Sequence, residues 1–563
     1  MLRRRIAPPL SRDPSASSMG SDEKQSRLNQ RTFGVTNRIW LILALFLFLL
    51  SFTHYIVPTP QPPALHTFSS LNLTPKNYLN ASEAAPNPFD FCPVYGPGDE
   101  IGLKHGAVTM GKTRLHLGSS ARIQRVLNKA LSGQQVTISI LGGSVSACHG
   151  AGDDPISPKC YPSRFFEWWN TVFPHPASEL TNGAMRRTNS EYFAFCSTHH
   201  IPDATDLVII ELDVDDHADK ESLENFEILI RSILIRPDEP AVLLLGHFSP
   251  DIHTAYGFNG PEQSHNIVAQ FYDVPHISVK PMVYPDYMRD PDSISKFYAD
   301  PVLASSMGHE LLSEVLIGYL QQQICTAWGV ATGTAFDAVP VRTSFEPPTG
   351  GAGGDAPLPF GGAGLRKGPA DQDGGADGAD AAKLAGLPPT SNLFHPALHV
   401  PRARIGTRPN DDTPFREVAP FCVSANDLIN PLPPSLFYGS GWHAFHPNVG
   451  SSSLNTKAHY WHSTLPTSKL RVPIMVGAGD VAVYYVKEPI SAVGEGSAVA
   501  CWVDDNYGGA RTIENAADVP ESTAALFYID RFVAAGSHFV ECQLMGEEGQ
   551  GVPIFKIIGI FAT

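Results

Sequence analysis

The chain has 563 residues, 43% of them hydrophobic, so it is long enough for two or three domains with buried cores. Its formal net charge of −16, with no basic stripe beyond the amino-terminal segment, argues against nucleic acid as a partner. Residues 1–38 hold eight Lys or Arg against three Asp or Glu, so the positive charge belongs to a tail and the remainder carries about −21.

The amino-terminal segment predicts a membrane anchor. Residues 1–38, rich in Ser, Arg and Pro, predict a disordered cytosolic tail. Residues 39–57 contain no Asp, Glu, Lys or Arg and are long enough, at about 1.5 Å per residue, to cross a bilayer as one transmembrane helix. A cleaved signal peptide is the alternative, but the preceding tail is long and no small-residue cleavage site follows. Arg31 and Arg38 flank the amino side, so we expect a single-pass type II protein of the secretory pathway, in the Golgi, with its carboxyl-terminal bulk lumenal or extracellular.

Residues 58–90 are predicted to form a lumenal stem. Asn72 and Asn80 each begin an N-glycosylation sequon there, which agrees with a lumenal position. All eight cysteines also lie beyond the predicted span, on the side where disulfides persist. Their even number permits four disulfides, but the sequence does not fix the pairing.

Residues 91–327 alternate between apolar runs of strand length and amphipathic helical segments. The runs at 136–141, 207–212 and 241–245 lack polar alternation, which is typical of strands covered on both faces. The helical segments lie at 122–131, 163–173, 221–235, 263–271 and 308–323. This alternation predicts an α/β domain with a doubly wound (flavodoxin-like) parallel sheet.

Residues 328–394 are rich in Gly, Pro and Ala and predict a flexible linker to a second domain at 395–563. That domain contains short apolar runs separated by Gly, Asp and Pro, at 474–476, 481–487, 498–503, 525–530, 538–544 and 555–561. This spacing predicts an all-β sandwich. Four of its residues suit stacking on sugars in a glycan-binding module, the alternative being packing in the core. They are Trp442, His443, Tyr460 and Trp461.

The strand predicted at 136–141 stops abruptly at Gly142-Gly143-Ser144. Two glycines let the backbone turn sharply and let another molecule approach, so we expect Ser144 at the carboxyl edge of the sheet with N–H groups nearby. A hydroxyl in that place suits a nucleophile. The alternative is an ordinary strand-to-helix loop with a serine cap.

This motif and those that follow it resemble, as an ordered set, the SGNH (GDSL-like) hydrolases. The resemblance is closest to the membrane-anchored fungal proteins of capsule-associated type in that class, and it covers roughly residues 90–327. The matching blocks are Gly142-Gly143-Ser144, Thr181-Asn182-Gly183-Ala184, Ser190-Glu191-Tyr192-Phe193, the run 206–216, Asp300 and Gly308-His309.

The resemblance implies a site made of a serine nucleophile, an oxyanion pocket and an Asp–His pair. Ser144 takes the position of the nucleophile and Gly183 that of the oxyanion glycine. The family's oxyanion Asn is replaced by Asp215, whose carboxylate would oppose developing negative charge unless it is protonated. Asp300 matches the family's Asp, but Leu303 stands where the His is expected.

The replacement for that His has to come from elsewhere in the chain. His309 is the leading candidate for the base because it begins the last helix near the same edge of the sheet, and His149 and His247 are rivals. Each candidate also has a structural interpretation: a helix-terminus histidine for His309, turn initiation for Asp300 and helix capping for Asp215.

Three hypotheses follow. In the first, which is our prediction, the protein is a membrane-anchored SGNH-type esterase or acyltransferase acting on acyl esters, expected to be O-acetyl groups of cell-wall or capsular polysaccharide. Its partners are then a glycan substrate and the membrane, with no cofactor and no metal. In the second, the domain has lost its base and serves as a glycan-binding or assembly factor. In the third, a divalent cation binds carboxylates and an imidazole after a strand, at Asp213, Asp215, Asp216 and His217.

Overall fold

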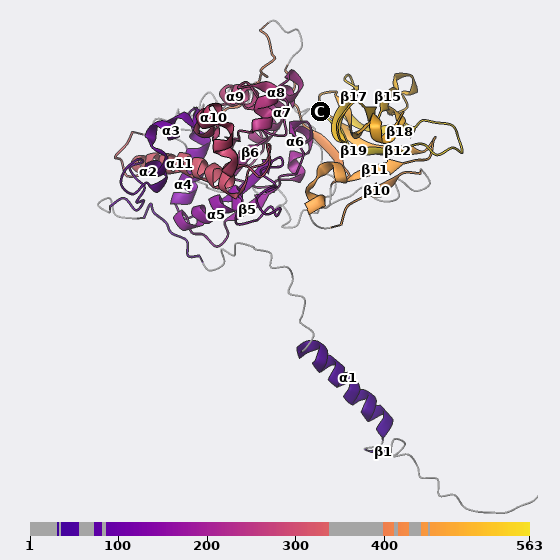
Figure 1. Cartoon of the computed structure of the whole chain (residues 1–563), viewed down its shortest axis with the longest axis horizontal. Helices are drawn as coiled ribbons and strands as arrows, with labels where there is room; N and C mark the ends of the chain where they lie inside the picture. The colour runs from indigo at the N-terminus through magenta and orange to yellow at the C-terminus, as the bar shows by residue number, and fades with distance from the viewer. Residues whose placement is uncertain are drawn as a thin grey trace, which may run out of the picture. The chain divides into compact units, whose positions relative to one another are not determined.

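The structure of the chain is a computed structural model that describes residues 31–32, 35–55, 73–80, 86–336, 398–409, 415–426, 441–448 and 451–563 (Figure 1). Most of the predicted cytosolic tail, most of the predicted linker and Asn72 lie outside these ranges. Asn80 lies within them, and its side chain is exposed.

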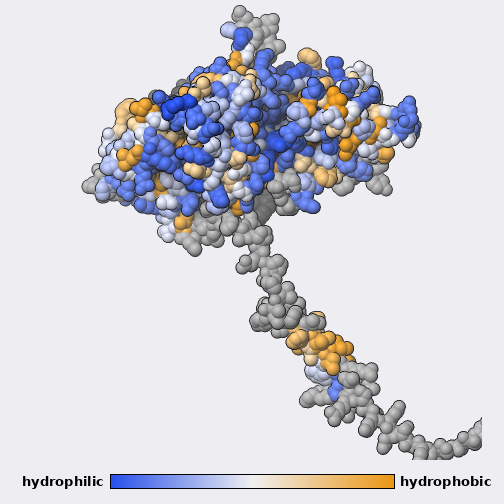
Figure 2. Space-filling model, in the orientation of Figure 1, coloured by the Kyte–Doolittle hydropathy of each residue, from blue (hydrophilic) through white to orange (hydrophobic). Residues whose placement is uncertain are grey.

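The chain divides into two units, Met1–Thr67 and Phe68–Thr563. The elements of the first unit are β1 (Arg31–Thr32), β2 (Val35–Thr36) and α1 (Asn37–Tyr55). The apolar side chains over 39–48 of α1 are exposed (Figure 2). Although α1 overlaps the span predicted at 39–57, no helix in the described part of the chain is both long enough and apolar enough to cross a membrane.

A six-stranded sheet forms the centre of the second unit's α/β domain. In spatial order its strands are β5 (Glu179–Asn182), β4 (Thr137–Gly142), β6 (Leu207–Glu211), β7 (Ala241–Gly246), β8 (His276–Ser278) and β3 (Arg114–His116). All neighbouring pairs are parallel except β8 with β3. Every residue of β6 and β7 is buried, which explains their continuous apolar sequences. The predicted α/β domain with a parallel sheet is confirmed.

Two hydrophobic cores lie on the two faces of this sheet. Successive residues of a strand point to opposite faces, so Ile140 of β4 belongs to the first core and Leu141 to the second. The first core is covered by α4 (Ala121–Leu131), α5 (Tyr161–Val172) and α11 (Ser306–Ala331), and the second by α6 (Ser190–Cys196), α7 (Lys220–Leu234) and α9 (Pro261–Tyr272). Shorter helices are α2 (Glu100–His105), α3 (Ala107–Lys112), α8 (Pro250–Tyr256) and α10 (Lys280–Arg289).

Part of the predicted stem packs against the α/β domain. Tyr78 and Phe89 are buried in the first core, and the Tyr78 hydroxyl donates a hydrogen bond to the Val172 carbonyl. A disulfide between Cys92 and Cys325 then ties this segment to α11. The chain entering the domain is therefore fixed to its last helix.

Two β-sheets pack face to face in the carboxyl-terminal region, so the predicted β domain is confirmed. The larger sheet contains β10 (His443–Phe445), β11 (Tyr460–Ser463), β19 (Phe555–Ala562), β13 (Val481–Pro489), β16 (Ala516–Ala517), β17 (Thr523–Asp530) and β9 (Phe421–Ser424). The smaller sheet contains β12 (Lys469–Val476), β18 (Gly536–Leu544), β14 (Ala498–Val503) and β15 (Arg511–Glu514). Trp442 and Trp461 are buried in the core between the sheets, so the suggestion that these two stack on sugars is wrong.

The second core of the α/β domain continues into the β domain. Phe561 of β19 belongs to it, and its ring stacks on that of Phe195 with centroids 5.2 Å apart. A disulfide between Cys196 of α6 and Cys422 of β9 crosses the same boundary. The remaining cysteines pair as Cys148–Cys160 and Cys501–Cys542, which leaves no free thiol among the eight. Packing and a covalent bond therefore join the two domains.

Candidate active site

Ser144 lies in the turn that follows β4, at the carboxyl edge of the parallel sheet. Only 5% of its surface is exposed. The preceding residue has to be glycine, because a Cβ atom on Gly143 would lie 1.9 Å from the Asp215 Oδ2 atom. The second glycine of the motif thus makes room for a carboxylate from the loop after β6.

Asp215 contacts Ser144 through both of its carboxylate oxygens. The Ser144 hydroxyl donates to Asp215 Oδ1 at 2.9 Å, and the Ser144 backbone N–H donates to Asp215 Oδ2 at 2.7 Å. The Arg187 backbone N–H in turn donates to Ser144 Oγ at 2.9 Å. Within the described ranges, no histidine makes a hydrogen bond to this hydroxyl. Asp215 therefore occupies both the place of the oxyanion Asn and the side of the hydroxyl where a base is expected.

The environment of Asp215 favours its protonated form. Burial raises the pKa of Asp215 to about 7, although the hydrogen bonds from Ser144 and the positive charge of Arg187 act in the opposite direction. The guanidinium of Arg187 is exposed and forms an ion pair with Glu521 of the β domain at 2.7 Å. Asp215 is thus poised to change its charge near neutral pH.

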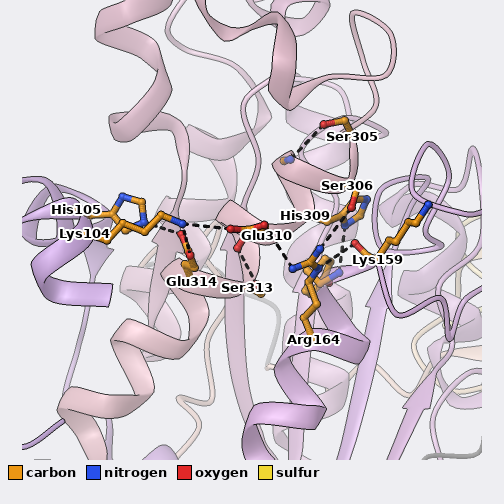
Figure 3. Close-up of polar contacts among 12 residues, drawn as sticks. Lys104, His105, Lys159, Arg164, Ser305, Ser306, His309, Glu310, Ser313 and Glu314 are labelled. Atoms are coloured by element: carbon orange, nitrogen blue, oxygen red, sulfur yellow. Dashed lines mark hydrogen bonds and ion pairs between the residues drawn. The ribbon is translucent and has the colours of Figure 1, made fainter. Parts of the chain in front are cut away.

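His309, the leading candidate for the base, faces the amino-terminal end of α5 (Figure 3). Its Nδ1 atom accepts a hydrogen bond from the Tyr161 N–H at 3.3 Å, and its ring stacks on that of Tyr161. The side chain is fully buried, and burial lowers the pKa of His309 to about 3. Beside it, Arg164 donates to Ser306 at 3.4 Å and pairs with Glu310 at 3.6 Å (Figure 3). The imidazole is therefore neutral and engaged with the backbone of α5.

Asp300 and Gly183 also have local structural partners. Asp300 Oδ1 accepts hydrogen bonds from the N–H groups of Val302 and Leu303 at 2.8 and 2.6 Å, which closes a turn. The Gly183 N–H donates to the Ile140 carbonyl at 3.0 Å, so it extends the pairing of β5 with β4. None of these hydrogen bonds involves Ser144.

The two rival histidines occupy different environments. His149 Nδ1 lies 2.8 Å from Asp153, and both side chains are exposed. His247 is 5% exposed, and burial lowers its pKa to about 4 although a backbone contact with Val302 acts in the opposite direction. It lines a small recess together with Ser249, Glu262 and other residues that follow β7.

The remaining carboxylates of the loop after β6 enclose His265, a residue that the sequence analysis did not single out. Its Nδ1 lies 2.7 Å from Asp213 and its Nε2 2.8 Å from Asp216. Burial opposes protonation, but these two hydrogen bonds raise the pKa of His265 to about 9. Phe226 stacks on the ring with centroids 3.9 Å apart. No short motif marks His265, because its partners lie about fifty positions away in sequence.

Asp213, Asp216 and His217, which the third hypothesis assigns to a divalent cation, have other partners in the structure. Asp213 also accepts from the His247 N–H and Asp216 from the Ser190 N–H, at 2.9 and 2.6 Å. His217 instead lies 3.2 Å from the Tyr256 hydroxyl. Across the part of the chain that the structure describes, no group of three or more His, Cys, Asp or Glu is arranged to hold a metal ion.

The β domain reaches the rim of the Ser144 turn. The Arg186 N–H donates to the Leu454 carbonyl at 2.7 Å, and the hydroxyls of Thr188 and Thr456 lie 2.7 Å apart. Together with the Arg187–Glu521 ion pair, these contacts fix the segment that donates to Ser144 Oγ. The loop beside the candidate nucleophile is therefore held by both domains.

Comparison with known proteins identifies the fold. No protein-family model matches the sequence, and no curated protein matches it. Among solved structures, a two-domain esterase (CEX) active on acetylated mannans aligns over 80% of this chain and 98% of its own, with a TM-score of 0.51 and 16% identity. The structure of that esterase co-crystallised with mannopentaose covers the same shares, at 16% identity and a TM-score of 0.50. The chain thus shares the two-domain fold of these structures.

Proposed function

We propose that this protein is a serine-dependent carbohydrate esterase or acyltransferase of SGNH type that acts on O-acetyl groups of a polysaccharide. The observation that carries the proposal is the position of Ser144, on a Gly-Gly turn at the carboxyl edge of a parallel sheet with its hydroxyl donating to a carboxylate. The two-domain fold supports it, because the similar solved structure is described as an esterase active on acetylated mannans. The fungal, capsule-associated relationship belongs to the same proposal and rests on the sequence blocks alone.

The reaction proceeds through an acyl-serine. Ser144 Oγ attacks the ester carbonyl, the sugar hydroxyl leaves, and the acyl group remains on Ser144. Water then removes it in a hydrolase, and a second sugar hydroxyl removes it in an acyltransferase. The rim shared by the two domains, with Arg187 and Glu521 exposed on it, gives a polysaccharide chain a polar surface beside Ser144.

The location in the secretory pathway is part of the proposal. Four disulfides support it, because such bonds form and persist in oxidising compartments. The exposed position of Asn80 is compatible with glycosylation there. Anchoring through residues 39–57, with the tail in the cytosol, is proposed on the sequence features alone.

A second candidate function is glycan binding or assembly without turnover. It is favoured by Leu303 at the expected position of the base and by a Ser144 hydroxyl that is engaged on both sides. In that case the protein would bind acetylated polysaccharide and leave its acetyl groups in place.

Acetate release separates the two functions. The purified full-length protein and its Ser144→Ala variant would be incubated with acetylated mannan, and free acetate would be measured over time. We expect release by the wild type and a loss of at least 100-fold in the variant, because the variant lacks the nucleophile. Binding of the polysaccharide without Ser144-dependent release of acetate would overturn the esterase proposal and support the binding function.

A further inference from the structure

We propose that Asp215 is the general base of this site, so that a Ser144–Asp215 dyad replaces the serine–histidine pair. This inference rests on the proposed esterase function and adds the residue that activates its nucleophile. The resemblance to SGNH hydrolases implies only an oxyanion role at this position, so the assignment comes from the contacts in the structure.

The geometry meets the first requirement for a base, which is reach. The distance of 2.9 Å from Ser144 Oγ to Asp215 Oδ1 lies within the range for direct proton transfer, and the hydroxyl is the donor. The second contact, from the Ser144 N–H to Oδ2, fixes the carboxylate relative to the serine backbone. Gly143 completes the arrangement, because any side chain there would collide with Oδ2.

No imidazole competes for this position in the described part of the chain. His309 accepts from the Tyr161 N–H, and His149 is paired with Asp153. His247 lines a recess beyond β7, and among the described residues it makes no hydrogen bond to Ser144. The position at which the family has its histidine carries Leu303, which has no proton to exchange.

The charges around Asp215 suit a base that works near neutral pH. Asp216 on the same loop disfavours its ionised form, Glu211 at the end of β6 is close enough to interact with it, and Arg187 favours the ionised form. Burial dominates and brings the pKa of Asp215 to about 7. A carboxylate with that pKa is a stronger base than an ordinary aspartate and is still ionised in half of the molecules at neutral pH.

The proton balance of the step is complete within the dyad. As Ser144 Oγ bonds to the acyl carbon, its proton moves to Asp215 Oδ1 and the carbonyl π electrons move to the carbonyl oxygen. Protonation weakens the hold of Asp215 on the Ser144 N–H, which then becomes available to the oxyanion. When the tetrahedral intermediate collapses, the leaving sugar oxygen takes the proton from Asp215. In the second half, Asp215 removes a proton from water or a sugar hydroxyl and returns it to Ser144.

The test compares three variants of the full-length protein with p-nitrophenyl acetate as substrate. Asp215→Asn keeps the size of the side chain and removes its basicity, so we expect kcat/KM to fall by at least 100-fold. Asp154→Asn is the matched control, because it neutralises an exposed carboxylate near the same turn and keeps the oxygen that accepts from the Ile156 N–H, and we expect less than a twofold change. Ser144→Ala defines the serine-dependent part of the rate. The wild-type kcat/KM should rise with pH to a plateau, with its midpoint near 7.

A second measurement covers the case in which a variant is damaged. Labelling of Ser144 by an organofluorophosphonate probe needs the activated hydroxyl but no turnover, and in the wild type its rate should rise with pH through the same midpoint. If Ser144-dependent hydrolysis exists but Asp215→Asn keeps more than a tenth of it, or labelling ignores pH between 5 and 9, the dyad is wrong and the esterase proposal stands. If the wild type shows neither Ser144-dependent hydrolysis nor labelling of Ser144 by the probe, both proposals fail.

Discussion

The loop after β6 carries two acidic sites that differ in one respect, which is how the negative charge is compensated. Asp213 and Asp216 share one buried imidazolium, that of His265, and each also accepts a backbone N–H. The carboxylate of Asp215, between them in sequence, accepts hydrogen bonds from the Ser144 hydroxyl and N–H, and no cationic side chain among the described residues is hydrogen-bonded to it. Asp213 and Asp216 are therefore paired with a cation, whereas burial without such a pair raises the pKa of Asp215 to about 7.

This difference shows how a fold separates structural from reactive carboxylates. Removing one partner of a buried, hydrogen-bonded ion pair is strongly destabilising, because it leaves an uncompensated buried charge. A carboxylate that is desolvated without a close cation has a pKa near neutrality and can exchange a proton. The ion pairs of His265 with Asp213 and Asp216 thus hold the loop in place while Asp215 changes its charge.

We expect the greatest loss of stability when the imidazolium shared by Asp213 and Asp216 is removed. We expect His265→Ala to lower the free energy of unfolding at pH 6 by about 3–5 kcal/mol, because it leaves two buried carboxylates without compensation. The folded pKa of His265, about 9, lies above its unfolded value, so this contribution is complete below about pH 6.5 and is lost as the pH rises through 9. Urea denaturation of the wild type and the variant at pH 6 and pH 10 measures the loss of stability and its dependence on pH.

His217→Ala is the matched control for that experiment, because His217 is exposed on the same loop and contacts only Tyr256. Its effect on the free energy of unfolding should stay within about 0.5 kcal/mol. An equal loss of stability in both variants would mean that the ion pairs of His265 with Asp213 and Asp216 make no specific contribution to the free energy of unfolding.

A smaller effect is expected from Asp215→Asn on stability. The folded pKa of Asp215 is raised to about 7, so between about pH 4 and 7 the folded state holds its proton more tightly than the unfolded state. Ionisation of Asp215 therefore destabilises the wild type progressively over this window, and the variant avoids that loss. We expect the free energy of unfolding of the variant to rise by about 1–2 kcal/mol relative to that of the wild type between pH 4 and 8. This rise is smaller than the pKa shift alone would give, because the side chain of Asp215 is only partly buried.

The measurement is a pair of urea titrations at each pH, with the difference between the proteins plotted against pH. The control Asp154→Asn, which changes an exposed carboxylate, should show no such rise. A difference that is constant from pH 4 to 8 would contradict an elevated pKa at Asp215.

Removal of the Arg187 side chain should have little effect on stability but should change the pKa of Asp215. Arg187→Ala removes an exposed ion pair with Glu521, so the free energy of unfolding should change by less than about 0.5 kcal/mol. The guanidinium lowers the pKa of Asp215, however, so the midpoint of the pH–rate profile should move upward in this variant. Glu521→Ala breaks the same ion pair but keeps the cation. A midpoint that moves upward as far in Glu521→Ala would show that Arg187 has no direct influence on Asp215.

Much of the fold could be predicted from the sequence, because long apolar runs leave few alternatives. The runs at 136–141, 207–212 and 241–245 correspond to β4, β6 and β7, whose residues are buried on both faces. The short strands β3, β5 and β8 were missed, of which β3 and β5 lie at the edges of the sheet. They span three or four residues each and carry no periodic pattern, so only their pairing in the folded sheet defines them.

The site was less predictable, because its contacts join distant parts of the chain. The Gly-Gly-Ser motif singled out Ser144, and the block comparison drew attention to Asp215 and Leu303. Nothing in the sequence indicated that Asp215 contacts Ser144 directly, because the two residues are 71 positions apart. No sequence feature indicated that His265 is buried between two carboxylates, because an isolated histidine in a helix can equally lie at the surface.

The disulfide between Cys196 and Cys422 has a consequence for the biosynthesis of the protein. Its two cysteines are separated by 226 residues, and Cys196 belongs to the α/β domain whereas Cys422 lies in the β domain. At translation rates of about 5–20 residues per second, the thiol of Cys196 is exposed to oxidation for roughly 10–45 s before its partner is synthesised. During that time Cys92, Cys148 and Cys160 are already present and could capture it. Early closure of the Cys148–Cys160 bond removes two of these competitors. Cys92 remains a competitor until Cys325 is synthesised, so mispairing with it has to be corrected by exchange that a disulfide isomerase catalyses.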